Sequence, residues 1–152
     1  MSKAPEAALT LDDHQQAFTE VSFLLDIFAA TIDSLMGGAT VSVGRIAGRQ
    51  MARNLPLYLP NPQLPDVLAA LAEHMRAGFE ISFHCTGATA ELTFGHCVIR
   101  DVCHTRNLPL GGELCRLFHH YTDGLVNELC LRPAKSALES GSDTCRAQLE
   151  IR

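Results

Sequence analysis

The spacing of apolar residues changes partway along the chain, and this change constrains the fold more than any other feature. Between Phe18 and Leu35 the apolar residues recur every three or four positions, which is the repeat of an amphipathic helix. From Phe79 to Cys85 they occupy every second position, which is the repeat of a half-buried strand. Helices are therefore followed by strands, an order typical of α+β proteins.

Three helices are expected before the first strand. Thr10 and Asp13 have the spacing of a capping box, and Gly37 and Gly38 end the helix that begins there. The expected ranges of the three helices are 11–36, 40–55 and 65–78. Residues 1–9 read as a flexible tail, so we expect a single domain over residues 10–152.

Two hairpins are expected to form the sheet. In the first hairpin Leu92, Phe94 and His96 share one face, while Cys97 lies on the other. The last strand alternates more cleanly, with these residues pointing inward: Cys145, Ala147, Leu149 and Ile151. A strong helix is expected between the hairpins, over 113–131. The sequence thus predicts an antiparallel four-stranded sheet of two hairpins packed against helices, in the order ααα-ββ-α-ββ.

Composition restricts the partners and the compartment. The formal net charge is -5 and the pI is about 5.7, which disfavours binding to nucleic acid through a basic surface. The N-terminus lacks an export signal, and the longest apolar stretch, 23–30, is interrupted by Asp26 and is too short to span a bilayer. A cytoplasmic location is therefore expected, in which the six Cys are buried thiols or ligands.

Cysteine and histidine gather between His96 and Cys145. Cys115 and His119 are four apart on one expected helix, so both can reach one ion. The candidate metal ligands are Cys97, Cys103, Cys115, His119 and Cys145. Such a set suits zinc or an iron–sulfur cluster, although the spacing matches no standard motif. The alternative is that the thiols are small core hydrophobes, the reading we favour for Cys85 and Cys130.

The second helix carries two patterns of its own. Gly44 and Gly48 would let another backbone approach closely, and together with the long apolar first helix they suggest a homodimer. Arg45, Arg49 and Arg53 form a stripe at the same spacing. This stripe is either a solvated face or a line of contacts to an anion or to a second copy.

The C-terminal part resembles a known family. The stretch from Cys115 to Gly124, the pair Arg132-Pro133 and the stretch from Gly141 to Cys145 resemble the vinyl-reductase-type hydrocarbon-binding domain family, whose fold is shared with TRAPP vesicle-tethering subunits. The resemblance is clearest over 95–152. It implies an apolar pocket, a homodimer built from N-terminal helices, and zinc bound at the positions of Cys115 and Cys145.

The sequence departs from this family at the expected zinc site. Two further ligands of the family, a Glu and a Cys, fall at Ala134 and Ala137, so half of that set is missing. Cys97, Cys103 and His119 could replace them, and an iron–sulfur cluster therefore competes with zinc.

A ligand pocket is expected between the first hairpin and the long helices, although a filled core remains the alternative. Its expected lining is Phe79, Ile81, Phe83, Leu92, Phe94, Phe118, Tyr121 and Leu125. We find no catalytic residues. The expected function is a small-hydrophobic-ligand-binding or sensory module with a Cys/His metal site, acting through a partner protein. The alternatives are a metal or iron–sulfur redox protein resembling a tetrapyrrole vinyl reductase, and a scaffold subunit.

Overall fold

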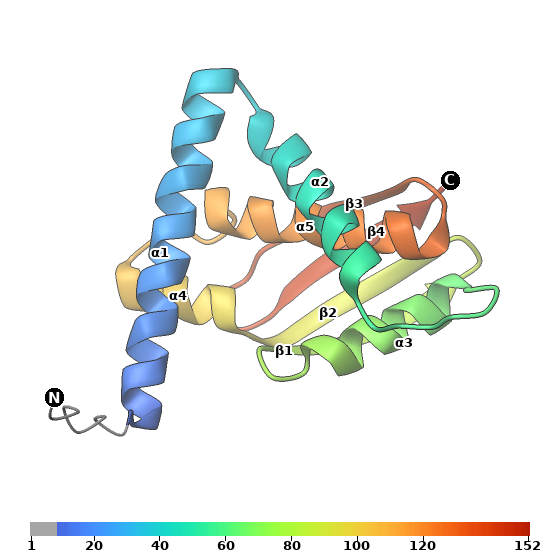
Figure 1. Ribbon diagram of the computed structural model, residues 1–152, viewed down its shortest axis with the longest axis horizontal. Coiled ribbons are helices and arrows are strands. Elements are labelled where there is room, and N and C mark those ends of the chain that lie inside the picture. Colours follow the sequence, from blue (N-terminus) through green and yellow to red (C-terminus); the bar gives the residue numbers. More distant parts are fainter. Residues whose placement is uncertain (1–8) are drawn as a thin grey trace, which may run out of the picture.

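The computed structural model describes residues 9–152 and has an α+β fold with a four-stranded antiparallel sheet (Figure 1). Its elements are α1 (Leu11–Met36), α2 (Ala39–Asn54), α3 (Leu64–Met75), β1 (Phe79–Thr86), β2 (Thr89–Cys97), α4 (Val98–Arg106), α5 (Glu113–Cys130), β3 (Ala134–Glu139) and β4 (Cys145–Ile151). The predicted fold class is confirmed. For residues 98–109 the sequence predicts an irregular or helical link, and the structure forms α4 there. Most of the expected tail lies outside the described residues.

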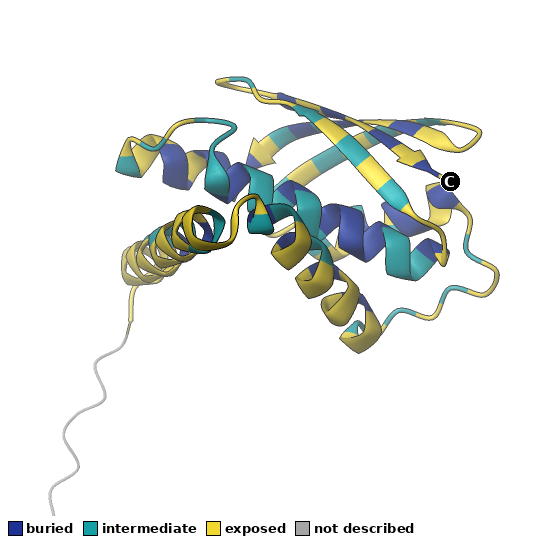
Figure 2. Cartoon of the chain, turned by 90° about the horizontal axis from the view of Figure 1, so that it is seen from above, coloured by how far each residue is buried: buried dark blue, intermediate teal, exposed yellow. Residues whose placement is uncertain are grey.

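The sheet joins the two hairpins in the order β1-β2-β4-β3. Burial alternates without interruption along β4, which confirms that Cys145, Ala147, Leu149 and Ile151 face inward. Figure 2 shows the sheet as one layer with the helices gathered on one side of it. The main core therefore lies between the sheet and α5.

A β-bulge corrects the expected alternation at the end of β2. Phe79 pairs with Cys97 and Ile81 with Phe94, so two residues of β2, Gly95 and His96, lie opposite one residue of β1. The extra residue reverses the facing of the strand beyond the bulge. His96 is exposed and Cys97 is buried, the opposite of the expectation from strict alternation.

Helices α2 and α5 are in backbone contact. A Cβ atom on Gly44 would lie 2.8 Å from the Leu117 carbonyl oxygen, and one on Gly48 would lie 2.9 Å from the Leu125 nitrogen. The surface of Gly44 and Gly48 is therefore used within the chain, and the expectation that it contributes to a dimer interface is wrong. Small residues reveal a close approach but do not identify the partner helix.

The arginine stripe also makes its ion pairs within the chain. Arg49 and Arg53 lie 3.2 and 2.7 Å from carboxylate oxygens of Glu128, and Arg45 lies 3.7 Å from Asp123. These contacts connect α2 to α5 alongside the glycine contact.

Helix α1 begins at the predicted capping box, in which Thr10 and Asp13 exchange hydrogen bonds. One side of it packs against α2, α4 and α5. The other side carries an apolar stripe whose members are between 47% and 79% exposed: Val21, Leu24, Leu25, Phe28 and Leu35. From residue 9 onward no helix is both long and apolar enough to cross a bilayer.

Candidate functional site

Four of the six cysteines come together at one end of the sheet, and each comes from a different element. Cys97 ends β2, Cys103 lies on α4, Cys115 lies in the first turn of α5, and Cys145 begins β4. All four are buried. Four of the five predicted metal ligands thus lie in one region, which we call the thiol cluster.

Within the thiol cluster, Cys103 on α4 and Cys115 on α5 pack in one small apolar cluster. A hydrogen bond between the Cys103 and Cys115 thiols lowers the pKa of Cys115 to about 7 and raises the pKa of Cys103. Burial opposes the first shift and adds to the second, while the Gly111 amide favours the Cys115 thiolate. The carboxylate of Asp26, on α1, raises both pKa values. Cys115 is therefore the thiol most easily ionised of this pair.

Cys97 has a second kind of environment, at the start of α4. Burial raises the pKa of its thiol, and the charge of Cys145 raises it further. Backbone amides of Arg100 and Ile99, in the first turn of α4, act in the opposite direction. The start of a helix therefore partly offsets the cost of ionising a buried thiol here, as it does at Cys115.

A buried arginine that was not identified from the sequence lies within the thiol cluster. Arg100 is only 6% exposed. Its guanidinium donates to the carbonyl oxygens of Phe94, at 3.3 Å, and Gly95, and lies 3.7 Å from the Cys145 sulfur. Arg100 and Cys103 are three residues apart on α4, so helical spacing was the available signal.

His119, the fifth predicted ligand, packs among aromatic rings. Its imidazole centroid lies 5.2 Å from that of Phe94 and 5.5 Å from that of Phe118, edge to face in both cases. Burial, followed by the nearby His120, lowers its pKa to about 4. The imidazole is therefore neutral at physiological pH.

The donor types of the thiol cluster suit a soft metal, but their present positions form pairs. Thiolates are the preferred ligands of zinc and of iron–sulfur clusters. Within residues 9–152 no three side chains of His, Cys, Asp or Glu are placed to hold one metal ion together. The metal site therefore stays a prediction that is supported by donor chemistry and burial.

The residues expected to line a pocket pack against one another. Leu92, Phe94 and Leu125 are buried in the main core, and Phe79 stacks on Phe118 with 4.4 Å between ring centroids. The other expected lining residues are partly buried against the same core: Ile81, Phe83 and Tyr121. The region between the first hairpin and α5 thus contains a well-packed aromatic cluster.

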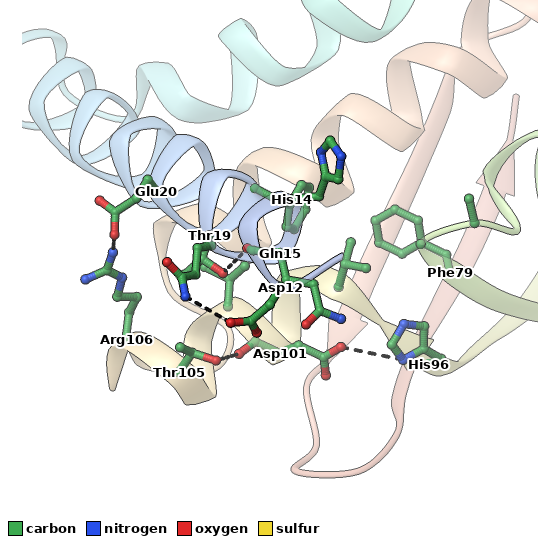
Figure 3. Close-up of a pocket in the computed structure, with 16 residues that line it drawn as sticks. Asp12, His14, Gln15, Thr19, Glu20, Phe79, His96, Asp101, Thr105 and Arg106 are labelled. Carbon is green, nitrogen blue, oxygen red and sulfur yellow. Dashed lines mark hydrogen bonds and ion pairs between the residues drawn. The ribbon is translucent and has the colours of Figure 1, made fainter. Parts of the chain in front are cut away.

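A groove of about 1090 Å³ lies beside this cluster, between the N-terminal half of α1, the length of α4 and the start of β1 (Figure 3). Phe18, Phe79, Val98 and Val102 are among its apolar lining residues. Polar side chains also line it: Asp12, His14, His96, Asp101 and Arg106. Its position depends on how α1 crosses α4, which residue spacing does not specify.

Helix α4 is the wall shared by the groove and the thiol cluster. Val98 and Val102 line the groove, and Val102 also packs with Cys103 and Cys115 in a small apolar cluster. Arg100, on the same helix, reaches Cys145. A molecule in the groove would therefore contact the helix that carries Cys103.

A buried carboxylate forms a separate polar cluster. Asp123 is 1% exposed and accepts a hydrogen bond of 2.5 Å from Ser136, while His120 Nδ1 lies 3.4 Å away. Together with the contact to Arg45, this cluster ties α2, α5 and β3 together. We interpret it as structural because its contacts join three elements and none of its residues lines the groove.

No family model and no curated protein matches this sequence. The resemblance to the hydrocarbon-binding family consequently stays a prediction based on the C-terminal motifs.

Proposed function

We propose that this chain is a binding and sensory module with a soft-metal site formed by Cys97, Cys103, Cys115 and Cys145. The observation that carries the proposal is the meeting of four buried thiols from four separate elements at one end of the sheet. A bound ion would tie β2, α4, α5 and β4 together at this point and so stabilise the fold. Zinc is the proposed metal, with an iron–sulfur cluster as the alternative.

Metal binding on this proposal changes the local structure. The thiols must leave their present pairs to reach one ion, and each must lose its proton. The helix starts at Cys97 and Cys115 support this ionisation. His119 keeps its place among the phenylalanine rings.

Metal analysis and an absorption spectrum of anaerobically purified protein test the proposal. A colourless protein with stoichiometric zinc, or a brown protein with iron and sulfide, is the expected result. Cys115→Ser and Cys145→Ser should lose the metal. Cys85→Ser and Cys130→Ser are matched controls, because these cysteines lie outside the thiol cluster. Full metal content in Cys115→Ser would contradict the site.

A second candidate function is the binding of a small apolar molecule in the groove. It is favoured by the groove's size and by its apolar residues on α4, the helix that also carries Cys103. Ligand binding and the state of the thiol cluster would then influence each other through α4. This is the sense in which we propose a sensory module acting through a partner protein.

A thermal-shift screen with small aromatics, fatty acids and tetrapyrroles tests the second candidate. A ligand at 100 times its dissociation constant should stabilise the fold by roughly 2.7 kcal/mol. Val98→Glu, which places a charge in the groove, should remove the shift, whereas Ser42→Glu on the exposed side of α2 should retain it. A shift that persists unchanged in Val98→Glu would place the ligand elsewhere.

We further propose that the protein forms a homodimer through the exposed apolar stripe of α1. We also propose that it is located in the cytoplasm. The dimer would cover the half-exposed side chains of Val21, Leu25 and Phe28. The location is supported by the free thiols of all six cysteines. An iron–sulfur spectrum would favour the redox-protein alternative over the sensor.

A further inference from the structure

The groove between α1 and α4 has two parts of different chemistry. Its apolar part includes two phenyl rings and two valine side chains: Phe18, Phe79, Val98 and Val102. Its charged part consists of three carboxylates and one guanidinium: Asp12, Glu20, Asp101 and Arg106. A groove with an apolar surface and a few charged groups suits a ligand that has an apolar body and a charged end.

The guanidinium of Arg106 is already engaged within the chain. It forms an ion pair with Glu20 on α1 and lies over the ring of Phe23, 5.1 Å from the ring centroid. Both contacts use its positive charge, since the face of an aromatic ring attracts a cation. Arg106 is therefore poorly placed to bind the carboxylate of a ligand, and its ion pair also compensates the charge of Glu20.

The carboxylates of Asp12 and Asp101 form no ion pair with a lysine or an arginine of residues 9–152. Asp12, in the first turn of α1, accepts a hydrogen bond of 3.2 Å from the neutral amide of Gln16. Asp101, in the first turn of α4, lies 3.6 Å from His96, an imidazole that is charged only when protonated. A ligand in the groove would therefore meet uncompensated negative charge from both helices (Figure 3).

We propose that the groove binds a small cationic amphiphile, namely a protonated amine with an apolar body. The apolar body lies against Phe79, Val98 and Val102, and the ammonium group lies near Asp12 and Asp101. The phenyl ring of Phe79 adds to the attraction, because a cation is favoured over its face. The inference rests on the proposed binding function of the groove and specifies the charge of its ligand, which disfavours fatty acids.

The positions of the two acids in their helices offer a competing explanation. A carboxylate in the first turn of a helix is favoured by the helix dipole, whether or not a ligand is present. If this were the whole role of Asp12 and Asp101, the groove would not distinguish an amine from an alcohol of similar shape. A role in binding requires such a preference, and requires that it disappear when the carboxylates are made neutral.

The test compares three probes that share one apolar body: phenylbutylamine, phenylbutanol and phenylbutyrate. Dissociation constants are measured by NMR titration at pH 8, where an unperturbed histidine is neutral and an alkylamine is protonated. The amine should bind roughly 10-fold more tightly than the alcohol, because an exposed ion pair contributes up to a few-fold in affinity and two carboxylates are present. The carboxylate probe should bind most weakly, and high salt should reduce the differences.

Asparagine variants remove the charges and keep the shape of the side chains. Asp12→Asn and Asp101→Asn should each lose part of the preference for the amine. The double variant should bind the amine about as weakly as the wild type binds the alcohol, with its affinity for the alcohol unchanged. Asp143→Asn removes a carboxylate at an exposed position outside the groove and should match the wild type. Melting temperatures show that folded proteins are being compared.

The outcomes separate the charge of the ligand from the binding function itself. Equal affinity of the wild type for the amine and the alcohol would overturn the cationic ligand and leave the groove standing as an apolar site. A preference for the amine that persists in the double variant would also overturn it, because the charge would then act from elsewhere. Binding of none of the three probes would overturn the groove as a binding site, and the cationic ligand with it.

Discussion

Cys103 on α4 and Cys115 on α5 pack together in one small buried apolar cluster. A hydrogen bond from the Cys103 thiol is the largest reason that the pKa of Cys115 falls to about 7 from the ordinary value of 9.0. A lower pKa means a larger thiolate fraction at neutral pH, and the thiolate is the reactive form.

Cys103→Ala is therefore expected to slow alkylation of Cys115 at pH 7.5. Without its donor the Cys115 thiol regains a higher pKa and a smaller thiolate fraction. The rate can be followed by mass spectrometry of reduced, metal-free protein treated with iodoacetamide. Cys130→Ala, in the main core, serves as the control. Equal rates in Cys103→Ala and the wild type would show that the bond does not activate Cys115.

The lowered pKa of His119 predicts that the fold loses stability in mild acid. Burial lowers its pKa from 6.5 to about 4, so the unfolded chain takes up a proton more readily than the folded one. The free energy of unfolding should therefore fall as the pH drops from about 6.5 towards 4, by roughly 3 kcal/mol at most from this residue. Urea unfolding at several pH values measures the slope.

Replacement of His119 by Phe should reduce that slope, because the new ring suits the neighbouring phenylalanines and does not titrate. His74→Gln changes an exposed histidine on α3 and should leave the slope unchanged. A slope that is as steep in His119→Phe as in the wild type would assign the effect to other groups.

Gly48→Ala should destabilise the fold although alanine favours helices. The new Cβ would overlap the carbonyl oxygen of Tyr121 and lie 2.9 Å from the Leu125 nitrogen, so α2 must move away from α5. Overpacking of this kind costs about 1–3 kcal/mol. Ser42→Ala, at an exposed position of the same helix, should be neutral or slightly stabilising. Thermal unfolding distinguishes the two, and an unchanged melting temperature in Gly48→Ala would refute the close contact.

Leu25→Glu is expected to shift the protein from dimer to monomer. Leu25 is 47% exposed and lies in the apolar stripe of α1, so a carboxylate there would be buried at the proposed interface. Light scattering at micromolar concentration reports the mass. Ser34→Glu, an exposed polar position of α1, should remain dimeric. A monomeric wild-type protein would count against the dimer directly.

Most of the fold could be predicted because it depends on residue periodicity. The alternation along β4 and the capping box at Thr10 depend only on neighbouring residues, and both are confirmed. The facing of Cys97 could not be predicted, since the bulge that buries it depends on pairing with β1. The same limit applies to Gly44, whose contact Leu117 on α5 is more than seventy residues away in sequence.

The candidate site was predicted in its residue types but not in its surroundings. Clustering in sequence identified Cys97, Cys103, Cys115 and Cys145, which the fold brings into one region. Arg100 was missed because an arginine on a short helix is ordinarily solvent-exposed. Its burial results from the meeting of α4 with the end of the sheet, which only the tertiary structure reveals.

Cys97 is both the last residue of β2 and the residue that caps the start of α4, so no loop separates strand from helix. A hinge would need flexible linker residues at this junction, and β2 is followed directly by α4. Any tilt of α4 must therefore twist the end of β2 and swing the Cys97 sulfur with it. The end of β2 and α4 therefore move as one rigid lever, so that a displacement of α4 at the groove displaces the sulfur of Cys97.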